Sequence, residues 1–174
     1  MSEDAPSTPA DVAANIEFAP WPTVVENDDL AMGELHFDMG PRLLTYAHGK
    51  SLGLPPKPAV PPFVFETTFI SVEKEAIVRV SSNHVIAFRV LDEAGLVDLW
   101  AAWPAQRKPG RTTFRATGHK WTEESFLAFL DGSGKPRFSY FVSTGDLCLE
   151  LVCYNEPVVK IVGPAVVSLE RGAR

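Results

Sequence analysis

The stretch SLGLPPKPAVPPFVFETTF, residues 51–69, decides whether the chain forms one folded unit or two. Five of the eight residues from Pro55 to Pro62 are proline, which suits a linker, a docking peptide or a connection within one domain. Only one convincing hairpin, over residues 33–48, precedes this run, and an isolated two-stranded hairpin is marginal in water. We therefore predict a stiff crossover at residues 55–62 inside a single β domain of residues 31–170. The PxxP pattern in PPKP leaves a docking role open.

The residues after Met32 alternate between apolar and polar with a period of two, which is typical of half-buried strands. Turn-forming residues separate the alternating runs, for example DEAG at residues 92–95 and DGSGKP at residues 131–136. The pattern predicts about ten or eleven strands and little helix, and the expected strands include residues 63–72, 76–81, 147–154 and 157–162. We expect an all-β antiparallel meander, and we prefer an up-and-down barrel over a β-sandwich.

The charges of the 174-residue chain are distributed unevenly around a formal net charge of −6. Nine acidic residues lie between Glu3 and Asp38, and the Ser/Pro/Asp-rich start predicts a flexible acidic arm over residues 1–30. Basic residues gather in residues 106–121, but an acidic protein without a recognisable reader motif argues against nucleic acid.

Membrane insertion is not expected, because the sequence lacks the roughly 18 consecutive apolar residues of a spanning helix. Cys148 and Cys153 lie five residues apart in one expected strand and would point to opposite faces, so they would not bridge each other. Reduced cysteines fit a cytoplasmic protein best, and a secreted protein whose leader was removed stays open.

The segment LAMGELHFDMGPRLLTYAHG, residues 30–49, resembles the opening glycine-centred hairpin of calycin-type barrels, the lipocalin-like and MoaF-like group. The resemblance covers about twenty residues and implies a closed barrel. Barrels of that kind typically enclose one small, mostly apolar ligand.

The register of this first hairpin predicts a polar face. A three-residue loop at residues 40–42 would place His36 opposite Tyr46, and Glu34 opposite His48. Imidazole, phenol and carboxylate within hydrogen-bond reach are suited to acid–base chemistry, so His36, Tyr46 and His48 are candidate catalytic residues. The alternative is an ordinary solvated outer face.

Single charges embedded in apolar strands, among them Arg89 and Glu150, form a second group of unusual positions. If Leu91 pairs with Leu96, Arg89 lies directly across from Asp98 in a hairpin. The same register places Trp100 opposite Ala87 and Trp103 opposite His84, as core residues, a ligand wall or an oligomer contact. The candidate ligand-binding residues are Glu66, Arg89, Trp100, Trp103 and Arg115.

Two functions stay open at this point. In the first, the barrel interior binds a small, largely apolar or aromatic molecule, as a carrier or as a cofactor-independent lyase, isomerase or cyclase. In the second, the domain is an interaction module, such as an immunity, adaptor or self-assembling protein, and apolar residues on both faces of some strands suit a homodimer. The histidine and cysteine spacings predict no metal site, and no motif implies a cofactor.

Overall fold

The fold was examined in a computed structural model, which describes residues 16–38, 64–102, 111–124, 129–130, 134 and 137–165. The described residues form nine strands and three short helices. The strands are β1 (Glu17–Pro20), β2 (Leu30–Asp38), β3 (Val64–Ser71), β4 (Ala76–Ser82), β5 (Val85–Asp92), β6 (Thr113–Thr117), β7 (Ser139–Ser143), β8 (Leu147–Cys153) and β9 (Val158–Pro164). The helices are η2 (Glu93–Leu96), α3 (Val97–Ala102) and α4 (Lys120–Glu124), and none of them is long and apolar enough to cross a membrane.

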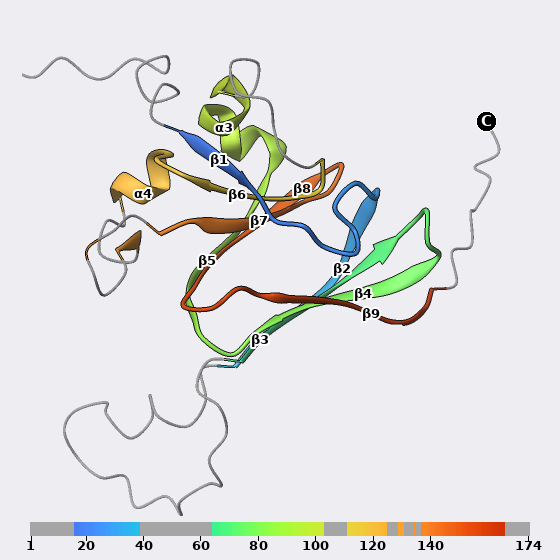
Figure 1. The fold of residues 1–174 in the computed structure, drawn as a ribbon. Helices are drawn as coiled ribbons and strands as arrows, with labels where there is room; N and C mark the ends of the chain where they lie inside the picture. The colour runs from blue at the N-terminus through green and yellow to red at the C-terminus, as the bar shows by residue number, and fades with distance from the viewer. Residues whose placement is uncertain are drawn as a thin grey trace, which may run out of the picture.

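The strands build two antiparallel sheets, which confirms the prediction of an all-β antiparallel protein (Figure 1). The first sheet has the order β1-β6-β7-β8-β5, and the second has the order β2-β3-β4-β9. Strand β2 pairs with β3, so strands before and after the proline-rich stretch share one sheet. Residues 55–62 themselves lie outside the described residues.

One bent ribbon connects the two sheets. Strands β4 and β5 follow each other with only Asn83 and His84 between them, and their partners β9 and β8 are also consecutive in the chain. At the bend, the Tyr154 amide donates to the His84 carbonyl at 3.0 Å. Both strands of the ribbon therefore pass from one sheet to the other at the same side, which Figure 1 shows at the left.

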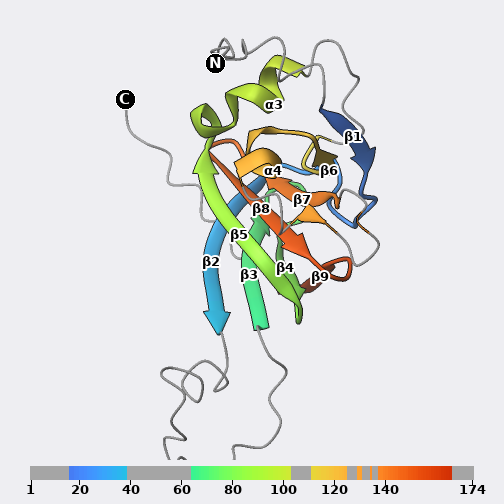
Figure 2. The same cartoon turned by 90° about the vertical axis from the view of Figure 1, so that its left-hand side faces the viewer.

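Two apolar cores lie on opposite faces of the first sheet. One core lies between the sheets and includes Trp21, Phe65, Phe69 and Leu151. The other lies under α3, on the face of the first sheet that points away from β3 and β4 (Figures 1 and 2). Its fully buried members are Ile16, Leu96, Leu99, Ala102, Phe114, Ala116, Phe141 and Cys148.

The N-terminal part of the domain requires a correction. Residues 16–30 were expected to belong to a flexible arm, but β1 pairs with β6, and Ile16, Trp21 and Val25 are at most 1% exposed. These apolar side chains bury in the two cores, which holds the segment against the first sheet. Residues 1–15 lie outside the described residues.

The predicted hairpin between Arg89 and Asp98 is wrong, because residues 93–102 are helical. Asp92 caps η2 by accepting a hydrogen bond from the Gly95 amide at 2.9 Å. Leu96, Leu99 and Ala102 are then buried at a spacing of three, which is helical and not strand-like. Trp100 therefore lies on α3 and does not pair with β5, and Trp103 lies outside the described residues.

Candidate functional site

The polar face predicted on the first hairpin is exposed where the structure describes it. His36 on β2 lies directly across from Glu66 on β3, and His36 is exposed. Glu66 forms an ion pair with Arg79 at 3.2 Å, in which both side chains are about two-fifths exposed. This face corresponds to the solvated alternative. Tyr46 and His48 lie outside the described residues, so their predicted partnership with His36 stays a prediction.

The space between the sheets is occupied by buried apolar side chains. Phe65, Phe69, Val78 and Val80 from the second sheet are fully buried there. Phe37, Phe65 and Phe88 also contact one another, with ring centroids 4.9 to 6.4 Å apart. The described candidates for a site therefore lie at the margin of this core and on the opposite face of the first sheet.

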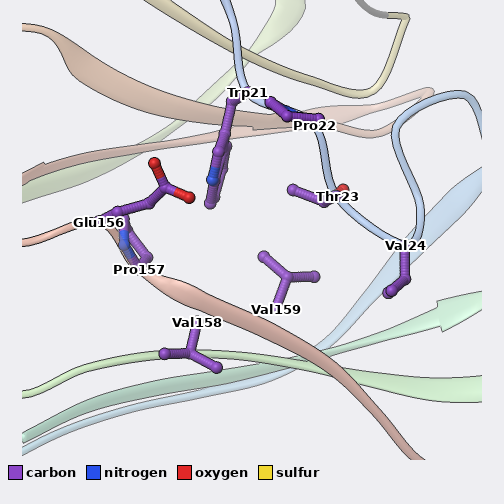
Figure 3. A pocket seen from close by; sticks show the side chains of 8 residues that line it. All are labelled: Trp21, Pro22, Thr23, Val24, Glu156, Pro157, Val158 and Val159. Carbon is purple, nitrogen blue, oxygen red and sulfur yellow. The ribbon is translucent and has the colours of Figure 1, made fainter.

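A groove of about 510 Å³ opens between the segment that follows β1 and the segment that leads into β9 (Figure 3). Its lining residues are Trp21, Pro22, Thr23, Val24, Glu156, Pro157, Val158 and Val159. Trp21 and Pro157 are buried and form the floor, whereas Val24 and Val158 are about half exposed and form the rim. The Glu156 carboxylate points toward the Trp21 ring, and it is the one ionisable side chain among the described lining residues.

The floor of the groove is supported by a polar pair on the first sheet. The Tyr140 ring packs edge-on against Trp21 at 5.0 Å, and Arg115 is the cross-strand neighbour of Tyr140. Burial raises the pKa of Tyr140 from 10.0, the charge of Glu156 raises it further, and Arg115 opposes the shift. Arg115 also donates from Nε to the Pro20 carbonyl at 3.0 Å. This predicted ligand-binding residue thus braces the groove from behind and does not line it.

A buried polar cluster lies on the other face of the first sheet, around Glu150 of β8. Oε1 of Glu150 is 2.5 Å from Nε2 of His119 and 2.7 Å from Oγ of Ser139. Its Oε2 atom accepts from Nε of Arg89 at 2.6 Å. Glu150, His119 and Ser139 are at most 1% exposed, whereas the Arg89 side chain is 25% exposed. We call these four residues the Glu150 cluster.

Local structure explains how His119 enters this cluster. Gly118, with φ of 76°, adopts the left-handed conformation that glycine tolerates, and it turns the chain after β6. His119 then precedes α4, whose first amide, that of Lys120, donates to Asp98 of α3 at 2.8 Å. The rings of Phe129 and Phe141 meet the imidazole edge-on. The imidazole is thus enclosed by aromatic rings except where it contacts the carboxylate.

The chemistry of the Glu150 cluster differs from that of a nucleophilic triad. In a triad, the hydroxyl hydrogen-bonds the histidine and the histidine hydrogen-bonds the carboxylate. Here both Ser139 and His119 contact the same carboxylate, and Ser139 is also 3.2 Å from the Ala116 carbonyl. Nucleophilic attack by Ser139 is therefore not what this arrangement favours.

The sequence had marked Arg89 and Glu150 as embedded charges, but it had assigned Arg89 the wrong partner. The two lie opposite each other because β5 pairs with β8, which is far away in the chain. His119 and Ser139 were missed, since neither stands out from its neighbours in the sequence. Trp100 packs partly buried against the core under α3.

No protein-family model, no curated protein and no solved structure matches this chain. The similarity of residues 30–49 to calycin-type barrels therefore stays a prediction. Among the residues that the structure describes, no group of three or more His, Cys, Asp or Glu side chains could hold a metal ion. The fold and the two candidate sites define an all-β protein with two antiparallel sheets, a surface groove and a buried polar cluster.

Proposed function

We propose that the protein binds a small, largely apolar or aromatic molecule in the groove between residues 21–24 and residues 156–159. The observation that carries this proposal is the groove itself: its volume of about 510 Å³ lies within the range of small-molecule sites. Its lining is mainly apolar, with one carboxylate and one hydroxyl for orientation. The sequence predicted a site in a barrel interior, whereas the proposed site lies at the margin between the two sheets.

The negative charge of Glu156 in the lining favours some apolar ligands over others. Glu156 supplies a negative charge next to Trp21, and an aromatic face and a carboxylate together favour a cationic group. We therefore propose an aromatic or alicyclic amine as the ligand class. Catalysis is not part of this proposal, because the described lining residues include one ionisable side chain and an acid–base reaction generally needs a matched pair.

The finer architecture is also a proposal. We propose a flattened barrel that is open along one side, because the bent ribbon of β4–β5 and β8–β9 carries strands from sheet to sheet at the other side. Strands β1 and β2 are the outer strands of the two described sheets, and the segment between them contributes Trp21 and Val24 to the groove.

The experiment compares three ligands of similar shape: 1-naphthylmethylamine, 1-naphthylmethanol and 1-naphthoate. Calorimetric titration should show the amine binding most tightly and the acid most weakly. Val158→Lys, at a position that is 45% exposed, should block the groove without unfolding the protein. Val97→Lys on α3, at a position that is 62% exposed, is the matched control and should leave binding unchanged. If none of the three ligands binds the full chain, the proposal fails.

A second candidate function is assembly with another copy of this chain. Next to the groove, β9 and its preceding turn expose Tyr154, Val158, Ile161 and Val162, each between 43% and 66%. In the described sheet β9 pairs only with β4, so its outer edge could accept another strand. Light scattering after size exclusion should then report a dimer that Ile161→Lys converts to a monomer. A wild-type monomer at high concentration would rule out this assembly.

A further inference from the structure

We propose that Arg89 binds the carboxylate of a small organic acid at the outer face of the first sheet. This second binding site is independent of the groove, because Arg89 belongs to the Glu150 cluster and the groove floor lies on the opposite face of that sheet. The proposal rests on how the guanidinium is held, on the partial exposure of the Arg89 side chain, and on hydrogen-bonding positions of the cluster that have no partner among the described residues.

The guanidinium of Arg89 is fixed from two directions. Glu150, which is 1% exposed, accepts from Nε at 2.6 Å and thereby occupies the inner edge of the guanidinium. The Trp121 ring of α4 lies over the guanidinium carbon at 4.5 Å and restrains its plane. An arginine held in this way loses little conformational entropy when it binds a ligand.

The terminal nitrogens of Arg89 are the donors assigned to the ligand, because Nε already donates to Glu150. The Arg89 side chain is 25% exposed, while the other three members of the cluster are buried. Within the described part of the chain, its hydrogen bond to Glu150 is made through Nε alone. The two terminal nitrogens present parallel N–H groups, which match the two oxygens of a carboxylate.

A purely structural role does not explain the cluster fully. Nδ1 of His119 is buried and has no hydrogen-bond partner among the described residues. A buried network that serves only stability normally satisfies its members, because an unpaired buried polar atom is costly. Both His119 and Arg89 thus have hydrogen-bonding capacity that the described protein groups do not use.

The charge of the cluster favours a carboxylate over phosphate. The Arg89 and Glu150 charges cancel, and Glu150 repels a dianion more strongly than a monoanion. A monoanion is repelled less by Glu150 and still accepts the paired hydrogen bonds from Arg89. Benzoate is a suitable probe, with benzamide as its uncharged counterpart and inorganic phosphate as the competing anion.

The test follows the indole N–H of Trp121 and the Nε–H of Arg89 by NMR while benzoate is added to the full chain. Both resonances should shift with one common affinity, and benzamide should shift neither. Arg89→Lys keeps a positive charge for Glu150 but loses the paired donors, so benzoate affinity should fall by about tenfold or more. Arg79→Lys, in the exposed pair with Glu66, is the matched control and should change nothing.

Three results would overturn the proposal: no shift of either resonance with benzoate, equal affinity in wild type and Arg89→Lys, or tighter binding of phosphate than of benzoate. If Arg89→Lys does not fold, the wild-type resonances still decide, because they report on the site directly. Val158→Lys separates this site from the groove, since it should abolish amine binding and leave benzoate binding intact.

Discussion

Three side chains of the described part of the chain converge on the buried carboxylate of Glu150. This carboxylate accepts from Arg89 and Ser139 and contacts His119, and Arg89 would lose its opposite charge if the carboxylate were neutralised. Breaking such a buried pair costs more than its formation gains, because the remaining charge stays desolvated. The stability of this region therefore depends on Glu150 far more than on an exposed acid.

We predict that Glu150→Gln lowers the free energy of unfolding by about 3 kcal/mol. The matched control is Glu66→Gln, which removes a charge from an ion pair at the surface and should cost less than about 1 kcal/mol. Urea unfolding monitored by circular dichroism measures both. Equal losses in the two variants would contradict the structural importance of the Glu150 cluster.

Cys153 gives a pH-dependent prediction. Burial raises the pKa of its thiol from 9.0 to about 11, while Ser82 and Arg137 oppose the shift. Between these two values the unfolded chain loses the thiol proton and the folded chain keeps it. The free energy of unfolding should therefore fall as the pH rises from about 9 to 11, by at most about 1.4 kcal/mol per pH unit for this group.

The measurement is urea unfolding at a series of pH values for wild type and Cys153→Ala. The variant should show a shallower fall with pH, whatever its absolute stability, because it lacks the titrating thiol. Tyr140, whose pKa is also raised, contributes a fall of the same sign above pH 10 in both proteins. Identical slopes in the two proteins would contradict the prediction.

Helix α3 forms where the sequence predicted a strand, and the burial of its residues explains the difference. Leu99 is fully buried in the core under α3, whereas Val97 on the same helix is 62% exposed. A strand over these residues would place positions 97 and 99 on the same face. In the helix these two positions lie on different faces, so substitutions at Val97 and Leu99 distinguish a helix from a strand.

We predict that Leu99→Ala lowers the free energy of unfolding by about 3 kcal/mol, because it leaves a cavity in the core under α3. Val97→Ala should change it by less than about 0.5 kcal/mol, since its side chain already faces solvent. Chemical denaturation measures both. Similar losses at the two positions would favour the strand.

At the scale of the whole molecule, the topology joins segments that are distant in the chain. Strand β1 pairs with β6, β4 pairs with β9 and β5 pairs with β8, and each pair closes a long loop. We predict refolding in about milliseconds to seconds, because loop-closure entropy must be overcome before these pairings stabilise the fold. Stopped-flow tryptophan fluorescence measures the rate. A main phase in microseconds would contradict the described pairings.

The alternation of apolar and polar residues was sufficient to predict most strands. It placed β3, β4, β8 and β9 correctly, because each lies in a pleated sheet whose two faces differ or are both covered. It also predicted that Cys148 and Cys153 point to opposite faces, and they lie in different cores. It failed at residues 96–102, where short apolar runs fit either period.

Local patterns were enough to predict the all-β class, the positions of most strands and the unusual charges of Arg89 and Glu150. The pairing of distant strands, the burial of Ile16, Trp21 and Val25 in the cores and the contacts of His119 and Ser139 with Glu150 became visible in the folded chain alone. The physical reason is that alternation is a local property of a pleated strand, whereas partner choice depends on the best burial of all faces together. The groove and the Glu150 cluster both consist of residues that are far apart in the chain, so no local sequence pattern predicts them.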